Sequence, residues 1–208
     1  MKTGALVGAS DFNEDRFREM YDAGMFDVVI AVDGGYEYLN DMGIVPNLAM
    51  GDFDSLGYEP KKIRVVKFPA NKDKSDMELA ISRAKTMGCD EIYAFGVLGR
   101  RLDHTIANLY IFAEACEQGM SVCLVDAENA VFFIKGPDVF EADAREDGIV
   151  SVFSMSDVST GVFERGMKWD LDDVELTNRT SRGLSNQLIG EPVMIGVESG
   201  TLMIFFPL

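Results

Sequence analysis

The stretch DVVIAVDGGYEYLNDMGIVPNLAMGDFD, residues 27–54, contains the pattern that decides the fold. An apolar run rich in β-branched residues ends at Asp33, and a turn into a helix at Tyr36 follows. A second apolar run, NLAM, comes next and ends in a loop that carries two aspartates. Short apolar runs of this kind are typical of strands buried on both faces of a parallel sheet.

The same alternation extends from the N-terminus to about Ala127. Further strand-type runs are ALVGA, IRVVKF, EIYAFG and SVCLVD. One helix is predicted over 75–87, where Ser75 and Glu78 form a capping-box pattern. Another is predicted after Arg101, with one apolar face made by Leu102, Ile106, Leu109, Tyr110, Ala113 and Cys116. The alternation predicts an α/β fold, with a mostly parallel sheet and helices on both faces.

The helical spacing stops after about Asn129. The runs AVFFIK, DVFEA, GIVSVFSM, VELTN, PVMIGVES and TLMIFFPL are separated by turn residues and are typical of short strands. We therefore expect residues 1–128 to form the α/β domain. Residues 129–208 are expected to form a smaller all-β domain, an antiparallel sandwich or barrel.

Composition narrows the classes of partner and the compartment. A net charge of -16 argues against nucleic acid and against anionic membranes as partners, because both are bound through basic surfaces. The three cysteines, Cys89, Cys116 and Cys123, show no metal-site spacing and are expected to be reduced thiols. No signal peptide or membrane-length apolar run is evident, so we expect a cytoplasmic protein.

Five polar segments each follow a predicted strand. They are Ser10 with Asp11, the turn 33–35, Asp52 with Asp54, Asp73 with Asp76, and the segment 96–103. The carboxyl ends of parallel strands share one edge of a sheet, and ligands bind in the crevice there. We therefore expect these segments to converge on one site.

The pair Asp52 and Asp54 is the most informative of these segments. On an extended backbone both carboxylates would share one face, with Phe53 on the other, and their repulsion would favour a bound cation. Mg²⁺ prefers one or two carboxylates together with phosphate oxygens. A plain polar turn is the alternative. Cations that could help to bind an anionic substrate stand beside the acidic segments at Lys72, Lys74, Arg100 and Arg101.

Other candidates have equally ordinary structural explanations. Gly34 and Gly35 would permit a tight turn, or let backbone N–H groups approach a phosphate. Asp76 and Asp103 would suit the first turns of their helices as well as they would suit ligand binding. His104, the one histidine, is better explained as a helix-start residue than as part of a nucleophilic triad, because no GxSxG elbow is present.

Taken in order, the blocks AVDGGYEYL, GDFDSL, KDKSDMELA, GVLGRRLDHTIANL, RGMKWDL and GLSNQL resemble the thiamine pyrophosphokinase family across nearly the whole chain. The resemblance implies a Rossmann-like α/β domain for nucleotide binding and catalysis and a β-sandwich for thiamine binding and dimerisation. It also implies a homodimer with active sites shared between subunits. The implied reaction transfers diphosphate from MgATP to the hydroxyl of thiamine and releases AMP.

The resemblance also implies roles for matching residues. The metal ligands would be Asp52, Asp54 and Asp76, and the catalytic group would add Asp73, Arg101 and Asp103. Nucleotide binding would involve Asp33, Gly34, Gly35, Gly96, Arg100, Arg101 and His104. Thiamine would contact Trp169, Ser185 and Asn186. One departure is Arg100, which stands where the family usually has a glycine, and the residues do not decide whether Asp73 or Asp103 is the base.

Three alternatives remain at this point. The acidic loops alone would equally suit a related pyrophosphokinase that acts on another small alcohol, such as a hydroxymethylpterin. A non-catalytic metal or nucleotide sensor could keep the same fold. An aspartyl-nucleophile phosphatase is disfavoured, because its acids would follow the first strand rather than the third strand-like run.

Overall fold

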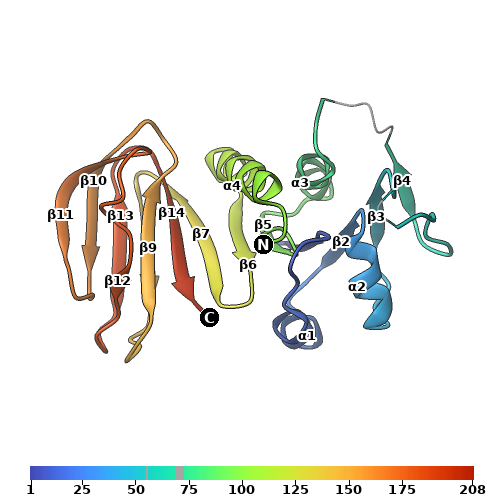
Figure 1. Ribbon diagram of the computed structural model, residues 1–208, viewed down its shortest axis with the longest axis horizontal. Coiled ribbons are helices and arrows are strands. Elements are labelled where there is room, and N and C mark those ends of the chain that lie inside the picture. The colour runs from blue at the N-terminus through green and yellow to red at the C-terminus, as the bar shows by residue number, and fades with distance from the viewer. Residues whose placement is uncertain (55, 69–72) are drawn as a thin grey trace. The chain divides into compact units, whose positions relative to one another are not determined.

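The computed structural model describes residues 1–54, 56–68 and 73–208 (Figure 1). The chain divides into two compact units. Unit 1 comprises Met1–Ile111 and Gly119–Ala127, and unit 2 comprises Phe112–Gln118 and Glu128–Leu208. Lys72, one of the expected cations, lies outside the described residues.

Unit 1 is built on a parallel sheet. Its strands are β1 (Thr3–Val7), β2 (Val28–Val32), β3 (Leu48–Gly51), β4 (Val65–Lys67), β5 (Glu91–Phe95) and β6 (Ser121–Val125). They lie in the order β4-β3-β2-β1-β5-β6, and each neighbouring pair is parallel. This confirms the predicted α/β class.

Helices cover both faces of this sheet. They are α1 (Glu14–Asp22), α2 (Gly35–Asp41), α3 (Asp76–Thr86) and α4 (Leu102–Glu117). In Figure 1, α1 and α2 lie on one side of the strands and α3 on the other. All residues of β2 are buried, as a strand covered on both faces requires. The predicted capping of α3 is confirmed, since the Ser75 side chain accepts a hydrogen bond from the Glu78 N–H at 3.2 Å.

The strand order reverses beside β1. The chain runs from β1 outward through β2, β3 and β4, and it then returns to place β5 and β6 on the other side of β1. After the neighbouring strands β1 and β5, the chain therefore continues in opposite directions along the sheet, towards β2 and towards β6. In open α/β sheets this is where ligands bind.

The apolar face predicted for α4 is only partly buried. Ala113 and Cys116 are buried, whereas Leu102, Ile106 and Tyr110 are exposed. The first half of this predicted apolar face is therefore exposed and only its second half contributes to the core. Periodicity shows that apolar residues share a stripe, but it does not show how much of the stripe a neighbouring element covers.

Unit 2 contains two antiparallel sheets. One has the order β12-β9-β14-β7 and the other β11-β10-β13-β8. The strands are β7 (Asn129–Lys135), β8 (Asp138–Ala142), β9 (Ile149–Ser154), β10 (Val158–Arg165), β11 (Leu171–Thr177), β12 (Asn186–Gln187), β13 (Val193–Val197) and β14 (Thr201–Pro207). Side chains of both sheets form one hydrophobic core that includes Val152, Val162, Leu176, Ile195 and Ile204. The all-β prediction is confirmed as a sandwich.

Strand β10 is absent from the sequence-based prediction. Its sequence, VSTGVFER, contains a glycine at position 161, two hydroxyl residues and a charged end, which obscure the strand signal. The alternation is nevertheless present, because Val162 and Glu164 are buried while Arg165 is exposed. Missing this strand also meant missing Glu164.

Across the described helices of both units, none combines the length and apolarity needed to cross a membrane.

Candidate active site

The loops after β1 and β5 are hydrogen-bonded to each other at the point where the strand order reverses. The Ser10 N–H donates to the Gly96 carbonyl at 2.8 Å, and the Asp11 N–H donates to the Leu98 carbonyl at 3.2 Å. Gly96 has φ +63, and a Cβ there would collide with the Gly8 carbonyl oxygen. The glycine predicted for nucleotide binding is thus required by the close approach of two backbones.

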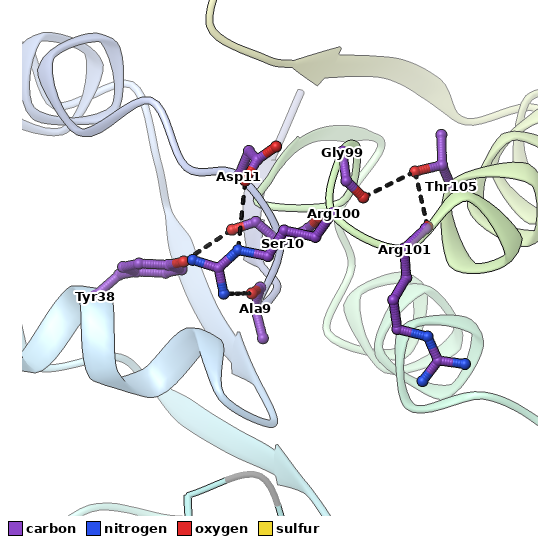
Figure 2. A network of polar contacts seen from close by, with 8 residues as sticks. All are labelled: Ala9, Ser10, Asp11, Tyr38, Gly99, Arg100, Arg101 and Thr105. Carbon is purple, nitrogen blue, oxygen red and sulfur yellow. Dashed lines mark hydrogen bonds and ion pairs between the residues drawn. The ribbon is translucent and has the colours of Figure 1, made fainter.

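Arg100 ties the same two loops together from its side chain. Its Nη1 donates to the Ala9 carbonyl at 3.1 Å, and its Nε lies 3.4 Å from a carboxylate oxygen of Asp11 (Figure 2). The residue has φ 45, a left-handed conformation that costs glycine far less than any other residue. The backbone geometry therefore explains why a glycine would suit this position. Tyr38, from α2, supports the loop by donating to the Ser10 carbonyl at 2.8 Å.

Arg101 and Asp103 form a two-point ion pair at the start of α4. Arg101 Nε donates to Asp103 Oδ1 at 3.2 Å and Nη2 donates to Oδ2 at 2.7 Å. The hydrogen bond from Arg101 lowers the pKa of Asp103 to about 2. Figure 2 shows the Arg101 guanidinium directed away from the Arg100 contacts. Both side chains are exposed, so the Arg101 guanidinium is accessible to an anionic ligand.

His104 lies in the first turn of α4 and is exposed. Its N–H donates to Asp103 Oδ1 at 3.0 Å, which makes Asp103 a local capping group as well as the partner of Arg101. The described contacts of His104 are those of a helix-start residue.

The acidic loop after β3 is held by the residue that ends β2. The Asp33 N–H donates to the Met50 carbonyl at 2.7 Å, and Asp33 Oδ1 accepts from the Phe53 N–H at 3.1 Å. The Asp54 N–H then donates to Asp52 Oδ1 at 3.1 Å. Asp33 is therefore brought next to the Asp52–Asp54 pair, and its side chain shapes that loop.

The loop is not extended as the sequence pattern suggested. Phe53 has φ +61, which turns the backbone between the two aspartates. The ring of Phe53 is nevertheless buried, while Asp52 is partly exposed and Asp54 is exposed. Burial of the ring, together with the Asp33 hydrogen bond, stabilises a backbone conformation that a phenylalanine rarely adopts.

The glycines after β2 have a packing role. Gly34 is the N-cap of α2 without a side-chain cap. Gly35 is buried, and a Cβ there would collide with the carbonyl of Val7 at the end of β1. The glycine at position 35 thus lets α2 begin directly against the sheet edge.

The segment after β4 contributes Asp73 and Asp76. Asp76 is the first residue of α3 and is partly buried, whereas Asp73 is exposed. Lys74 pairs with Glu78 at 2.7 Å, one turn along the helix. Within residues 1–54, 56–68 and 73–208, no three side chains of the metal-binding types lie close enough together to hold one ion.

Unit 2 contains a pocket of about 330 Å³ at one end of the sandwich. It is lined by Glu164, Trp169, Leu171 and the segment 182–186. All three residues predicted to contact thiamine lie at this pocket, which joins Trp169 to the later pair Ser185 and Asn186. Ser185 has φ 62, and its N–H donates to the Ser151 hydroxyl at 3.0 Å, which fixes the loop against β9.

The Asn186 amide is the centre of the hydrogen bonds around the pocket. Its Nδ2 donates to Glu164 Oε2 at 2.9 Å and to the Trp169 carbonyl at 2.7 Å. Its Oδ1 accepts from the Trp169 N–H at 3.1 Å and from the Gln187 N–H at 2.9 Å. A side-chain amide has two donor hydrogens and two acceptor lone pairs, so this group is fully used within the chain. Asn186 therefore positions Trp169 and Glu164.

Glu164 is an acidic residue in the lining of this pocket. It is only 1% exposed, yet it contributes to the pocket lining. Burial raises its pKa to about 6, an effect that the Asn186 hydrogen bond opposes and the charge of Asp170 adds to. Its Oε1 is buried without a hydrogen-bond partner. The period-two alternation with Val162 was the one signal in the sequence that could have identified it.

Trp169 is 53% exposed, so its indole is not part of the hydrophobic core. The Lys168 ammonium lies 4.7 Å from the centre of its ring and donates to Gln187 Oε1 at 2.8 Å. A cation over an aromatic face is attracted by the ring quadrupole. The indole therefore already has one cationic neighbour from the chain itself.

Known proteins match both units of this chain. Residues 24–124 match the family described as "Thiamin pyrophosphokinase, catalytic domain", and residues 139–202 match "Thiamin pyrophosphokinase, vitamin B1 binding domain". A thiamine pyrophosphokinase from Bacillus subtilis is 31% identical over 171 residues, which cover 77% of this chain and 78% of the relative. The chain belongs to the thiamine pyrophosphokinase family.

Solved structures of thiamine pyrophosphokinases share the fold. The Bacillus subtilis structure has a TM-score of 0.83 at 25% identity and covers 98% of each chain. The structure from Geobacillus thermodenitrificans has a TM-score of 0.81 at 25% identity, with 99% of this chain and 97% of that chain covered. The yeast enzyme, at 15% identity, has a TM-score of 0.77 with coverage of 99% and 86%.

Each of the two matches to thiamine pyrophosphokinase domains contains one of the candidate sites. Asp33, the acidic loops and the Arg101–Asp103 pair lie within the match to the catalytic domain, at 24–124. The pocket at Trp169 lies within the match to the B1-binding domain, at 139–202. As a member of this family, the protein is a transferase.

Proposed function

We propose that this protein transfers the diphosphate group of ATP to the hydroxyl of thiamine, giving thiamine diphosphate and AMP. The observation that carries the proposal is the match of two successive segments, 24–124 and 139–202, to the catalytic and B1-binding domains of one family. A different small alcohol as substrate would leave the second match without a purpose.

ATP is assigned to the carboxyl edge of the parallel sheet, where the strand order reverses. The protein carries a net charge of -16, so a triphosphate needs local cations there. Arg100 and Arg101 are exposed and stand on the loop after β5. Phosphoryl-type transfer depends mainly on positioning and on neutralising charge, which arginine side chains can supply.

Mg²⁺ is assigned to the acidic loops as part of this proposal. The carboxylates of Asp52, Asp54 and Asp76 have the hard oxygen donors that Mg²⁺ prefers. Since no three ligand side chains are gathered among the described residues, the ion would be completed by phosphate oxygens and water. When bound, it would neutralise negative charge on the phosphates. The N–H of Phe53 holds Asp33 at this loop, so we assign Asp33 to shaping the metal-binding backbone.

Proton removal from the thiamine hydroxyl is assigned to a carboxylate of the same edge. Asp103 is a weak proton acceptor while Arg101 holds its pKa at about 2. If Arg101 turned to bind phosphate, this pairing would end and the pKa of Asp103 would rise. Asp73 carries no such pairing among the described contacts, and we assign it as the alternative base.

Thiamine is assigned to the pocket of unit 2. The exposed indole of Trp169 offers an aromatic face for a flat cation, an interaction of roughly 1–2 kcal/mol when water is excluded. Ser185 lines the same pocket and has a hydroxyl group for polar contact. Asn186 contributes indirectly, since its amide is occupied in holding Trp169.

The direct test is to incubate the protein with thiamine, ATP and Mg²⁺ and to identify the products. Thiamine diphosphate and AMP in equal amounts are expected. ADP as the nucleotide product, or no turnover, would contradict the proposal. The Asp54→Asn variant should fold normally and lose turnover, which separates an enzyme from a nucleotide sensor of the same fold.

A homodimer with active sites shared between subunits also forms part of the proposal. It assigns residues 1–128 to nucleotide binding and catalysis, and residues 129–208 to thiamine binding and dimerisation. The cytoplasmic location is proposed because the three cysteines are free thiols.

Mixing two inactive variants tests the shared site. Asp54→Asn disables the nucleotide half and Trp169→Ala disables the thiamine half. If each site takes its two halves from different subunits, mixed dimers contain one intact site and activity returns after subunit exchange. If both halves come from one chain, every site in the mixture keeps one defect and activity stays low.

A further inference from the structure

The two carboxylate oxygens of Glu164 have different surroundings. Oε2 accepts a hydrogen bond from Asn186 Nδ2 at 2.9 Å. Oε1 is buried without a partner. Buried polar groups almost always have a hydrogen-bond partner, and a carboxylate oxygen without one is costly. An oxygen left in this state beside a pocket is suited to a ligand that brings its own donor.

Side chains near Glu164 do not supply that donor. Lys168 is engaged with Gln187 and the Trp169 ring. Arg182 lines the same pocket, but Glu164 Oε1 remains without a partner. Asp170 adds negative charge, which makes an anionic ligand at this position unfavourable. The local chemistry therefore selects a ligand with an N–H group or a positive charge.

We propose that Glu164 Oε1 accepts a hydrogen bond from the amino group on the pyrimidine ring of thiamine, and that this contact selects thiamine over analogues without that group. The inference rests on the proposed function. Thiamine has two kinds of hydrogen-bond donor, the pyrimidine amino group and the hydroxyl. The hydroxyl must remain free to attack the phosphate. The amino group is thus the donor available to a buried acceptor in the pocket lined by Trp169.

The substitution Glu164→Gln tests this contact with little other change. Asn186 Nδ2 donates to Oε2, so the carbonyl oxygen of a glutamine would occupy the Oε2 position and preserve that bond. The glutamine NH₂ would then occupy the position of Oε1. The variant therefore converts an acceptor into a donor, while the hydrogen bonds around Asn186 remain.

The experiment compares kcat/KM for thiamine and for its 4-oxo analogue, in which a carbonyl oxygen replaces the amino group. The wild-type protein should prefer thiamine. Glu164→Gln should reduce or reverse this preference by roughly ten- to a hundredfold, the range for a hydrogen bond to a charged group. The KM for ATP should not change. Equal effects on both substrates would overturn the proposal, because they would show a structural role alone.

Binding measurements keep the inference separate from the catalytic proposal. Trp169 is the single tryptophan of the chain and lines the pocket, so its fluorescence reports ligand binding without turnover. If the wild-type protein binds thiamine but forms no thiamine diphosphate, the proposed function fails. The affinities of the wild-type protein and of Glu164→Gln for thiamine and its 4-oxo analogue then still decide the role of Glu164. An unchanged selectivity in an active protein refutes the Glu164 contact alone.

Two further variants provide controls. Glu175→Gln removes one carboxylate from an exposed position of β11 and should leave selectivity unchanged. Glu164→Asp keeps the charge but withdraws the oxygen by one methylene, so it should weaken thiamine binding without favouring the 4-oxo analogue. If Glu164→Gln does not fold, wild-type selectivity in Glu164→Asp would overturn the proposal.

Discussion

The buried carboxyl of Glu164 should make the stability of unit 2 depend on pH. Its pKa is raised from an ordinary value of 4.5 to about 6, mainly by burial. The folded protein therefore favours the protonated form. The stability that the protonated Glu164 carboxyl gives the folded protein is fully present below pH 4.5. It is lost as the pH rises through about 6, because the buried carboxyl must then ionise. The difference between the two pKa values corresponds to about 2 kcal/mol.

Glu164→Gln should remove this dependence, because glutamine does not titrate. Relative to the wild-type protein, the variant should gain about 2 kcal/mol in unfolding free energy between pH 4.5 and pH 7. The measurement is urea unfolding at several pH values, followed by the fluorescence of Trp169, which lies in unit 2. Taking the difference between the two proteins cancels the titration of the other acidic residues.

Glu175→Gln is the matched control, since Glu175 is exposed on the neighbouring strand β11. Its stability profile should run parallel to that of the wild-type protein. Parallel profiles for Glu164→Gln as well would refute the reasoning, because they would show that Glu164 ionises as easily in the folded chain as in the unfolded one.

Three more predictions concern the two sites. Asn186→Ala removes four hydrogen bonds, one of them to a buried carboxylate, and should lower the unfolding free energy by roughly 3–5 kcal/mol in urea titrations. Asn178→Ala, which loses one exposed hydrogen bond, should cost less than about 1 kcal/mol, and equal losses would contradict the structural role of Asn186. Arg100→Gly should be more stable than Arg100→Ala by roughly 1 kcal/mol, because only glycine adopts φ 45 without strain. Equal melting temperatures for the two variants in thermal unfolding would count against this. Lys168→Met removes the ammonium from the Trp169 ring, where it would compete with the thiamine cation, and should lower the KM for thiamine by roughly two- to fivefold. An unchanged or higher KM would show that Lys168 and thiamine do not compete for the ring.

Most of the α/β unit was predictable because its signals are local. Apolar runs mark the buried strands, Ser75 caps α3 as expected, and the polar segments follow strands whose parallel pairing brings them to one edge. The strength of these signals comes from burial on both faces, which requires uninterrupted apolar residues. Strand β10 was missed because it is half polar, and its buried acid broke the apolar alternation.

Local geometry at the sites was less predictable, because it depends on backbone conformations and distant partners. The turn at Phe53 depends on a hydrogen bond to Asp33, which is 20 residues earlier. The pairing of Arg101 with Asp103 sets the pKa of a candidate base, and the sequence shows only that the two residues are neighbours. Asn186 resembled a ligand contact, and its four hydrogen bonds within the chain assign it a positioning role.

From the sequence alone came the α/β class of the first part of the chain, the all-β class of the second part, and the resemblance to the family. These follow from hydrophobic periodicity and from motifs that are continuous along the chain. The folded chain was needed to show that Glu164 lines the same pocket as Trp169 with one carboxylate oxygen buried and unpartnered. The hydrogen bonds around that side chain join residues from separate strands and loops, so the state of its two oxygens follows from tertiary packing and not from a local pattern.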